Sequence, residues 1–399
     1  MELFWLEHKK LWRKKIVKIC VLLCFVYCVI FGSILSFQWF SFGSSDDYTS
    51  AFGNNFDGYT VIKDSQEYAL SFGGELTDET LQQIVSDYQQ MEADGMEKEL
   101  EKTDWQIVNS WLGTLYPELR DTSNYKTMIS YVDPDKLTGF YERRQQVLDE
   151  FLEISGQVGA EKEFLHQMER KVEKPFHYEW VEGWSTLLGS MVADLGVVMA
   201  LFLGIVLSSL FAGEWRDNTS TLVLTTRNGW GKIALAKILT GFAFTVELFA
   251  LLAVSSVISQ LFFMGTAGWD MPIQNIKLIA VAPMNMLQAE IYEYAFVLLG
   301  AIGFAGIVMF ISAAVKNNVL TLLLSLAVVY GPMMIAEYLP YEMQKALDLI
   351  PLVGSSTDIF RTNTFRIFGK LIWSPYLLIT IPVLIGILCM PFAIKSWSR

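Results

Sequence analysis

Cysteine and charge are both scarce in this chain of 399 residues. It has four cysteines, three in one apolar run near the N-terminus and one in the last apolar run, and charged residues make up 18%. About a quarter is usual for soluble domains. Because the polar part of the chain has no cysteine, a disulfide scaffold is excluded. The low charge and a hydrophobic content of 52% argue against a free-standing soluble enzyme and against a disordered chain.

The motifs of nucleotide and metal chemistry are also missing. A phosphate-binding loop needs Gly-x-x-x-x-Gly-Lys-Ser/Thr, whereas the segment 229–233 reads Gly-Trp-Gly-Lys-Ile and lacks both the spacing and the final hydroxyl. No His-x-x-x-His or Cys-x-x-Cys pair is present for a metal. Cys20, Cys24 and Cys28 recur on one helix face, which favours a packing stripe over a metal site. We therefore predict no catalytic residue, no metal and no cofactor in this chain.

Acidic residues are concentrated in one block. Residues 43–183 contain 29 Asp and Glu against 12 Lys and Arg, whereas the remainder contains 13 acidic and 18 basic residues. The net charge of −12 thus comes from a polar insertion inside a basic, apolar chain. This distribution excludes nucleic acid as a partner. The acidic surface could attract cationic peptides or simply keep the insertion soluble.

Long apolar runs surround this block, and each is close to the 20 residues that a membrane-spanning helix needs. We predict a polytopic α-helical membrane protein with six transmembrane helices and a mainly helical extracellular domain between helices 1 and 2. Small residues in the fourth span, such as Gly303 and Gly306, predict close helix packing. The predicted spans are 16–42, 184–212, Ile233–Phe263, Ile291–Val315, Val319–Tyr338 and Tyr376–Ile394.

Orientation follows from the lysine and arginine content of the short loops. With six spans, 13 basic residues fall on the side that holds both termini and the loop 213–232, against five on the opposite side. Both termini are therefore expected in the cytoplasm, and the acidic domain 43–183 outside. The expected location is a plasma membrane of bacterial type.

Two segments are expected to lie at the membrane surface. Residues 1–15 carry a Trp stripe and basic residues at helical spacing, typical of an interfacial amphipathic helix that contacts membrane lipids; a plain positive flank to the first span is the alternative. Residues near 340–374 have apolar patches too short to span. We expect outer interfacial helices there, with an ordinary loop as the alternative.

The outer domain shows four stretches of helical periodicity. The first begins near Leu76 with Thr77 or Asp78 as its cap. Two β-prone pieces, Tyr59–Ile62 and Thr127–Val132, could pair. The other expected helices are Asp104–Leu115, Gly139–Ile154 and Ala160–Glu173.

The loop between spans two and three contains a short apolar segment flanked by charges. Thr219 to Thr225 reads Thr-Ser-Thr-Leu-Val-Leu-Thr. A helix of this composition in the cytoplasm needs a partner for its apolar side, although a plain surface turn is the alternative. The residues that would take part in docking are Glu214, Arg216, Thr219, Thr221, Leu222, Leu224, Arg227 and Lys237.

This order, a Glu leaving one span, a Thr-Leu helix, then Arg and Lys before the next span, resembles the cytoplasmic loop of type-two ABC exporter permeases. The resemblance implies that Thr219 to Thr225 is a coupling helix that docks on a separate ABC ATPase subunit. ATP and Mg²⁺ would be bound by that partner. It also implies a second permease copy or a homologous permease, and a large outer insertion after span one.

A carboxylate within a membrane span is energetically costly and therefore suggests a function, and two such residues are candidates here. Glu247 is near the middle of span three and Asp194 is in span two. Either could line a translocation path, or be held protonated or hydrogen-bonded between helices. We expect an exporter permease for a peptide, antibiotic or other amphiphilic substrate, with sodium efflux as a minor option. The rival from another class is a receptor or immunity protein that binds a ligand through its outer domain and transports nothing.

Overall fold

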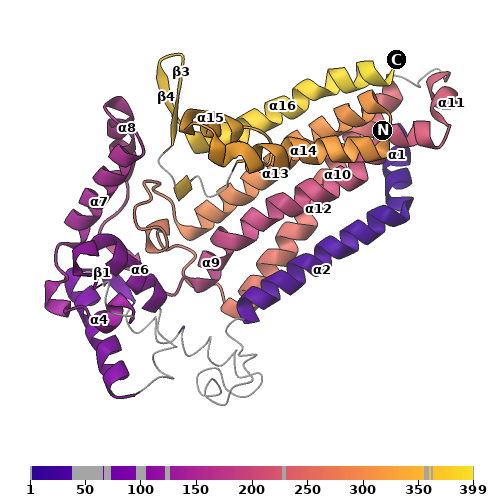
Figure 1. The fold of residues 1–399 in the computed structure, drawn as a ribbon. Helices are drawn as coiled ribbons and strands as arrows, with labels where there is room; N and C mark the ends of the chain where they lie inside the picture. The colour runs from indigo at the N-terminus through magenta and orange to yellow at the C-terminus, as the bar shows by residue number, and fades with distance from the viewer. Residues whose placement is uncertain are drawn as a thin grey trace.

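A computed structural model describes residues 2–37, 66, 73–95, 105–121, 126–226, 231–354, 359–360 and 363–398, without the side chains of 31–37, 105–106, 190–194 and 341. The chain is mainly helical. It divides into a bundle of long helices and a smaller outer domain at one end of that bundle (Figure 1).

Five helices are long and apolar enough to cross a membrane. The predicted spans two to six correspond to them. They are α10 (Val192–Arg216), α12 (Lys232–Met264), α13 (Met286–Val315), α14 (Asn318–Ile335, extended by the 3-10 turn Ala336–Tyr338) and α16 (Ser374–Trp397).

Helix α2 (Lys15–Phe37) runs along α12 (Figure 1). It covers the predicted first span as far as residue 37, and the rest of that span lies outside the described residues. Cys20, Cys24 and Cys28 are buried in the core of the bundle, as a packing stripe requires.

Helix α13 is the central element of the bundle and packs against α10, α12, α14 and α16. Asn285 caps its start in a reciprocal bond pair with Gln288. A Cβ atom on Gly306 would lie 2.6 Å from the backbone of Gly386 on α16, and one on Gly303 only 2.3 Å from the carbonyl of Pro382. Only glycine allows this approach, so the predicted close packing is confirmed.

Among the described residues the outer domain has four helices, which are α4 (Asp78–Ala93), α6 (Trp105–Leu115), α7 (Phe140–Ile154) and α8 (Ala160–Glu169). Helices α4, α6 and the start of α7 enclose its own apolar core, and Leu165 of α8 packs with Leu148 and Leu152 of α7 in a second cluster. Helix α4 begins after Thr77, whose hydroxyl accepts a bond from the backbone N–H of Thr80. Short strands β1 (Gly74–Leu76) and β2 (Phe176–Tyr178) pair antiparallel and close the domain.

Several local predictions were wrong. Thr127–Val132 is not a strand but contains the 3-10 turn Met128–Ser130, because its apolar residues Met128 and Ile129 are buried beneath α4 and α6. The observed strand pair was missed, since three-residue strands are too short to show periodicity. The fourth helix ends four residues early, at Glu169. The expected strand Tyr59–Ile62 lies outside the described residues.

The segment 340–374 also differs from expectation. Within the described parts of this segment, which exclude 355–358 and 361–362, α15 (Tyr341–Leu347) is the α-helix that precedes α16. Strands β3 (Thr364–Ile367) and β4 (Lys370–Trp373) form a hairpin whose turn holds Phe368 and Gly369 at positive φ. The β-branched and aromatic residues of both strands favour this hairpin over the predicted interfacial helices.

A buried arginine joins the outer domain to the loop between α12 and α13. Arg144 on α7 donates to the carbonyl oxygens of Leu278 (2.7 Å) and Ala280 (3.2 Å) and pairs with Glu169. Burial alone would raise the pKa of Glu169, but hydrogen bonds from Lys174 and Arg144 outweigh it and lower that pKa. The Arg144 guanidinium therefore links the two parts: it is neutralised by Glu169 within the outer domain and donates to backbone carbonyls of the loop between α12 and α13.

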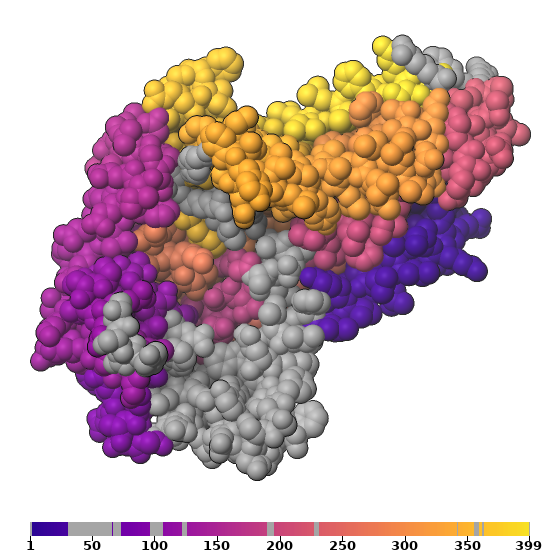
Figure 2. All heavy atoms as spheres, in the orientation of Figure 1, coloured from indigo at the N-terminus to yellow at the C-terminus, as the bar shows by residue number. Residues whose placement is uncertain are grey.

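The two ends of the bundle differ in character. Both termini and the short helix α11 (Ser220–Leu224) lie at one end, and the outer domain lies at the other (Figure 1). In the space-filling view, the residues around α11 form a rose-coloured projection at the edge of the molecule (Figure 2).

Candidate functional site at the connection between α10 and α12

Helix α11 is a five-residue helix at the edge of the bundle. It has no buried residue, and the side chain of Leu222 is 72% exposed. Val223 and Leu224 instead pack partly against the bundle core. Its bounds match the predicted segment, with Thr219 and Thr225 as the flanking caps. An apolar side chain so exposed on a polar connection is available for a partner.

A turn at Asn218 sets the direction of this helix. Asn218 adopts positive φ directly after α10, a conformation that asparagine tolerates better than most residues. Thr219 then donates its hydroxyl to the carboxylate of Glu214, and its backbone N–H bonds the Glu214 carbonyl at 2.9 Å. Thr219 makes no side-chain cap to α11, since its hydroxyl is used by Glu214.

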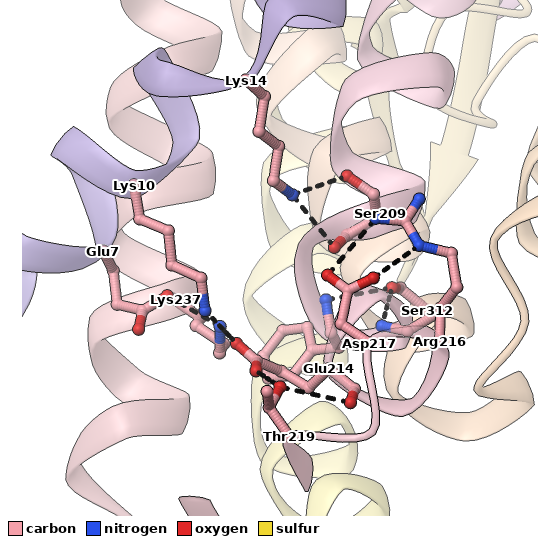
Figure 3. Close-up of polar contacts among 12 residues, drawn as sticks. Glu7, Lys10, Lys14, Ser209, Glu214, Arg216, Asp217, Thr219, Lys237 and Ser312 are labelled. Atoms are coloured by element: carbon pink, nitrogen blue, oxygen red, sulfur yellow. Dashed lines mark hydrogen bonds and ion pairs between the residues drawn. The ribbon is translucent and has the colours of Figure 1, made fainter.

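Glu214 is the centre of an ion network that joins four elements (Figure 3). Its side chain is buried in the last turn of α10, and Lys237 on α12 donates to it at 2.8 Å. Lys10, on the N-terminal helix α1 (Glu2–Arg13), donates to the same carboxylate oxygen at 2.5 Å. Lys237 also bonds Glu7 of α1 at 2.7 Å. The start of α11 is therefore tied to α1, α10 and α12 through one carboxylate.

A second lysine of the N-terminal segment lies beside this network without a carboxylate partner of its own. Lys14 bonds the hydroxyl of Ser209 at 2.9 Å and shares a cavity of about 20 Å³ with Glu214 and Lys237. Burial, followed by repulsion from Lys237 and Lys10, lowers the pKa of Lys14 to about 8. The cavity holds about one water molecule, so the network is a joint between helices rather than a substrate pocket.

The remaining predicted docking residues are on or near the surface. Arg216 pairs with Asp217 in an exposed side-chain contact. Thr221 is exposed on α11 and accepts through its carbonyl from the Thr225 hydroxyl. Arg227 lies outside the described residues. Of the eight predicted residues, the structure thus brings three together, namely Glu214, Thr219 and Lys237.

Glu247 contacts the N-terminal helix. The indole N–H of Trp12 donates to its carboxylate at 3.0 Å, and His8 Nε2 lies 3.2 Å from its other oxygen. The side chain of Glu247 is 42% exposed. Glu247 is thus paired with two side chains of α1 rather than left without a partner on α12.

Asp194, the second predicted path residue, lies in α10, but its side chain is outside the described set. The sequence pattern did not reveal that Glu7 and Lys10 of α1 pair with Lys237 and Glu214, or that His8 lies against Glu247. Their spacing on one helix was visible, but it was interpreted as a lipid-facing pattern.

Two further carboxyl groups were missed. Glu290 and Glu293 are buried in the first turns of α13. The predicted span began at Ile291, after Glu290, because the Asn285–Gln288 capping box was not recognised as the helix start. The i, i+3 spacing of the two acids was the signal that could have found them.

The described residues contain no group of three or more His, Cys, Asp or Glu side chains that could hold a metal ion. Comparisons with protein-family models, with curated proteins and with solved structures found no match to this chain. The site must therefore be interpreted from its own geometry.

Proposed function

We propose that this protein is the membrane-spanning subunit of an ATP-driven exporter, with α11 as the helix that docks on a separate ABC ATPase. The observation that carries the proposal is the exposed α11, which is fixed to three other helices through Glu214. In this proposal α2 is the first of six spans, the end with both termini is cytoplasmic and the outer domain is extracellular. The cargo class is a peptide or another amphiphile.

The ion network supports this function because it can transmit force. A displacement of α11 would be transmitted through Thr219 to Glu214. From Glu214 it would pass through Lys237 to α12 and through Lys10 to α1. Buried charge pairs resist separation, since an uncompensated buried charge costs several kcal/mol. The four elements would therefore move together when an ATPase moves α11. A second permease copy or a homologous permease would complete the path.

The test is co-purification with the ABC ATPase encoded in the same gene neighbourhood. Leu222→Asp places a charge on the exposed apolar side chain, and burying it against a partner carries a large desolvation cost. We expect this variant to lose ATPase binding and the stimulation of ATP hydrolysis. Leu222→Met keeps an apolar surface and should retain both.

Thermal unfolding in detergent provides the folding control, because Leu222 contributes little to the core. Full ATPase coupling in Leu222→Asp would refute α11 as the docking helix. If no ATPase co-purifies even with the wild-type chain, the ligand-binding receptor or immunity protein is the better assignment.

A further inference from the structure

Glu290 and Glu293 are the most deeply buried carboxyl groups of the bundle that the export proposal does not use. The exposed fraction is 4% for Glu290 and 0% for Glu293. All four of their carboxyl oxygens are buried, and none meets the distance and angle of a full hydrogen bond with a described residue, although the Tyr294 hydroxyl is close enough to interact with Glu290. With i, i+3 spacing they share one face of α13.

This arrangement is costly for two ionised carboxylates. An isolated charge in an apolar interior pays a large desolvation penalty, which proteins usually avoid by neutralising the group. Two carboxyl groups close enough to repel each other cannot both ionise readily, and Glu290 and Glu293 do act on each other electrostatically. The negative charge of at least one of the two carboxyl groups must therefore be neutralised, by a bound proton or by a nearby positive charge.

The surrounding side chains provide little compensation. The Tyr294 hydroxyl lies near Glu290 but pairs with Ser256 Oγ on α12 at 2.9 Å. Lys277, in the loop before α13, acts on Glu293 but is itself exposed to solvent. The helices packed against this end of α13 carry three other titratable residues, namely Glu182 on α9 (Glu182–Thr186), Asp194 on α10 and Tyr376 on α16. Cys28 on α2 acts on Tyr294.

A cavity brings solvent to this end of α13. It has a volume of about 350 Å³, and its wall includes Asn285 and Gln288 of α13 together with Lys171 and His177 of the outer domain. Neither Glu290 nor Glu293 is part of this wall. The cavity therefore opens the start of α13 to solvent, and the two carboxyl groups lie behind it, further along the helix.

We propose that Glu290 and Glu293 form a proton-binding site that holds an exchangeable proton in the folded protein. A proton neutralises the pair without a ligand shell, whereas a metal ion needs several further donors. The described residues offer no cluster of three or more metal-ligating side chains here. The site is independent of the export proposal, since it rests on α13 and not on α11.

The experiment is labelling with dicyclohexylcarbodiimide, a hydrophobic reagent that modifies protonated carboxyl groups. The full-length protein in lipid vesicles is treated across a range from mildly acidic to mildly alkaline pH, and modified residues are located by mass spectrometry. We expect labelling at Glu290 or Glu293 near neutral pH, decreasing as the pH rises. Glu214 is the matched control: it is buried but paired with two lysines, so it should not be labelled.

A second measurement tests the proposal even where the carbodiimide does not reach the two buried carboxyl groups. Infrared spectra should show a protonated-carboxyl C=O band that is lost in the double variant Glu290→Gln/Glu293→Gln, whose amides keep the side-chain shape. Absence of both the label and the band would overturn the proposal. Labelling blocked by sodium but not by choline would also overturn it, in favour of a cation site. None of these readouts depends on transport.

Discussion

Glu214 is at the unfavourable end of its helix. A carboxylate in the last turn of α10 faces the negative end of the helix dipole, and it is also removed from water. Lys237 and Lys10 compensate both costs, and Thr219 donates a further bond. A carboxylate held in this way has little freedom, which suits a residue that must pass motion from one helix to the next.

The first residue-scale prediction concerns this pair. Glu214→Ala leaves the buried ammonium group of Lys237 with Glu7 alone, and breaking a buried pair costs about 3–5 kcal/mol. We expect a clear fall in the unfolding temperature in detergent. The double variant Glu214→Leu/Lys237→Met should recover much of it, because no uncompensated charge remains.

Asp217→Asn is the control for that experiment. It removes an equally close charge pair with Arg216, but both side chains are exposed, and surface pairs contribute little to stability. If Glu214→Ala is no more destabilising than Asp217→Asn, the network does not hold the four elements together.

At the scale of elements, α1 is more than a flank of the first span. One of its faces packs on α12 through Leu11, Trp12 and His8, while Trp5 and Leu6 are exposed. Trp12 stacks edge-on against Phe244 with ring centroids 5.8 Å apart. The exposed apolar residues stay consistent with the predicted membrane-surface position.

Glu247 tests the contact between these two helices. Glu247→Gln keeps an oxygen acceptor for the Trp12 indole and should leave the unfolding temperature close to that of the wild type. Glu247→Leu leaves that N–H without its acceptor, at a cost of about 1–3 kcal/mol if water cannot replace it. In a Trp12→Phe background the two variants should become similar.

The same variants bear on the predicted translocation role of Glu247. A Gln variant that is fully stable and binds the ATPase, yet exports less, would assign Glu247 to the path. If Glu247→Gln exports at the wild-type level, the prediction that Glu247 lines the translocation path is wrong.

On the scale of the whole molecule, the polarity of the bundle matches the distribution of basic residues. The basic N-terminal helix, the α10–α12 connection and the C-terminus share one end, and the acidic domain occupies the other (Figure 1). Basic residues are retained on the cytoplasmic side of membranes, so this end should face the cytoplasm.

Cysteine labelling in intact cells checks that orientation. In a background with Cys389 replaced by Ser, Gln90→Cys on α4 should react with a membrane-impermeant maleimide, whereas Thr221→Cys on α11 should react only after lysis. Both positions are exposed; the other three cysteines are buried. Reversed labelling would contradict the proposed topology and the docking of α11 on a cytoplasmic partner.

The sequence alone determined those features that depend on local pattern. Spans two to six, the bounds of α11 and the helices α4, α6 and α7 follow from apolar run length and from a 3.6-residue period. Each of these signals is contained within a window of some 20 residues. The small-residue stripe around Gly303 likewise predicted close packing, because only the absence of a Cβ permits it.

Tertiary structure decided the features that depend on distant partners. Lys10 and Lys237 are 204 and 23 residues away from Glu214 along the chain, and Trp12 is 235 residues away from Glu247; no local pattern relates such pairs. The three-residue strands β1 and β2 exist only because folding brings them together. Burial of Glu290 and Glu293 also depends on distant partners, because the helices and the loop packed around α13 remove both side chains from water.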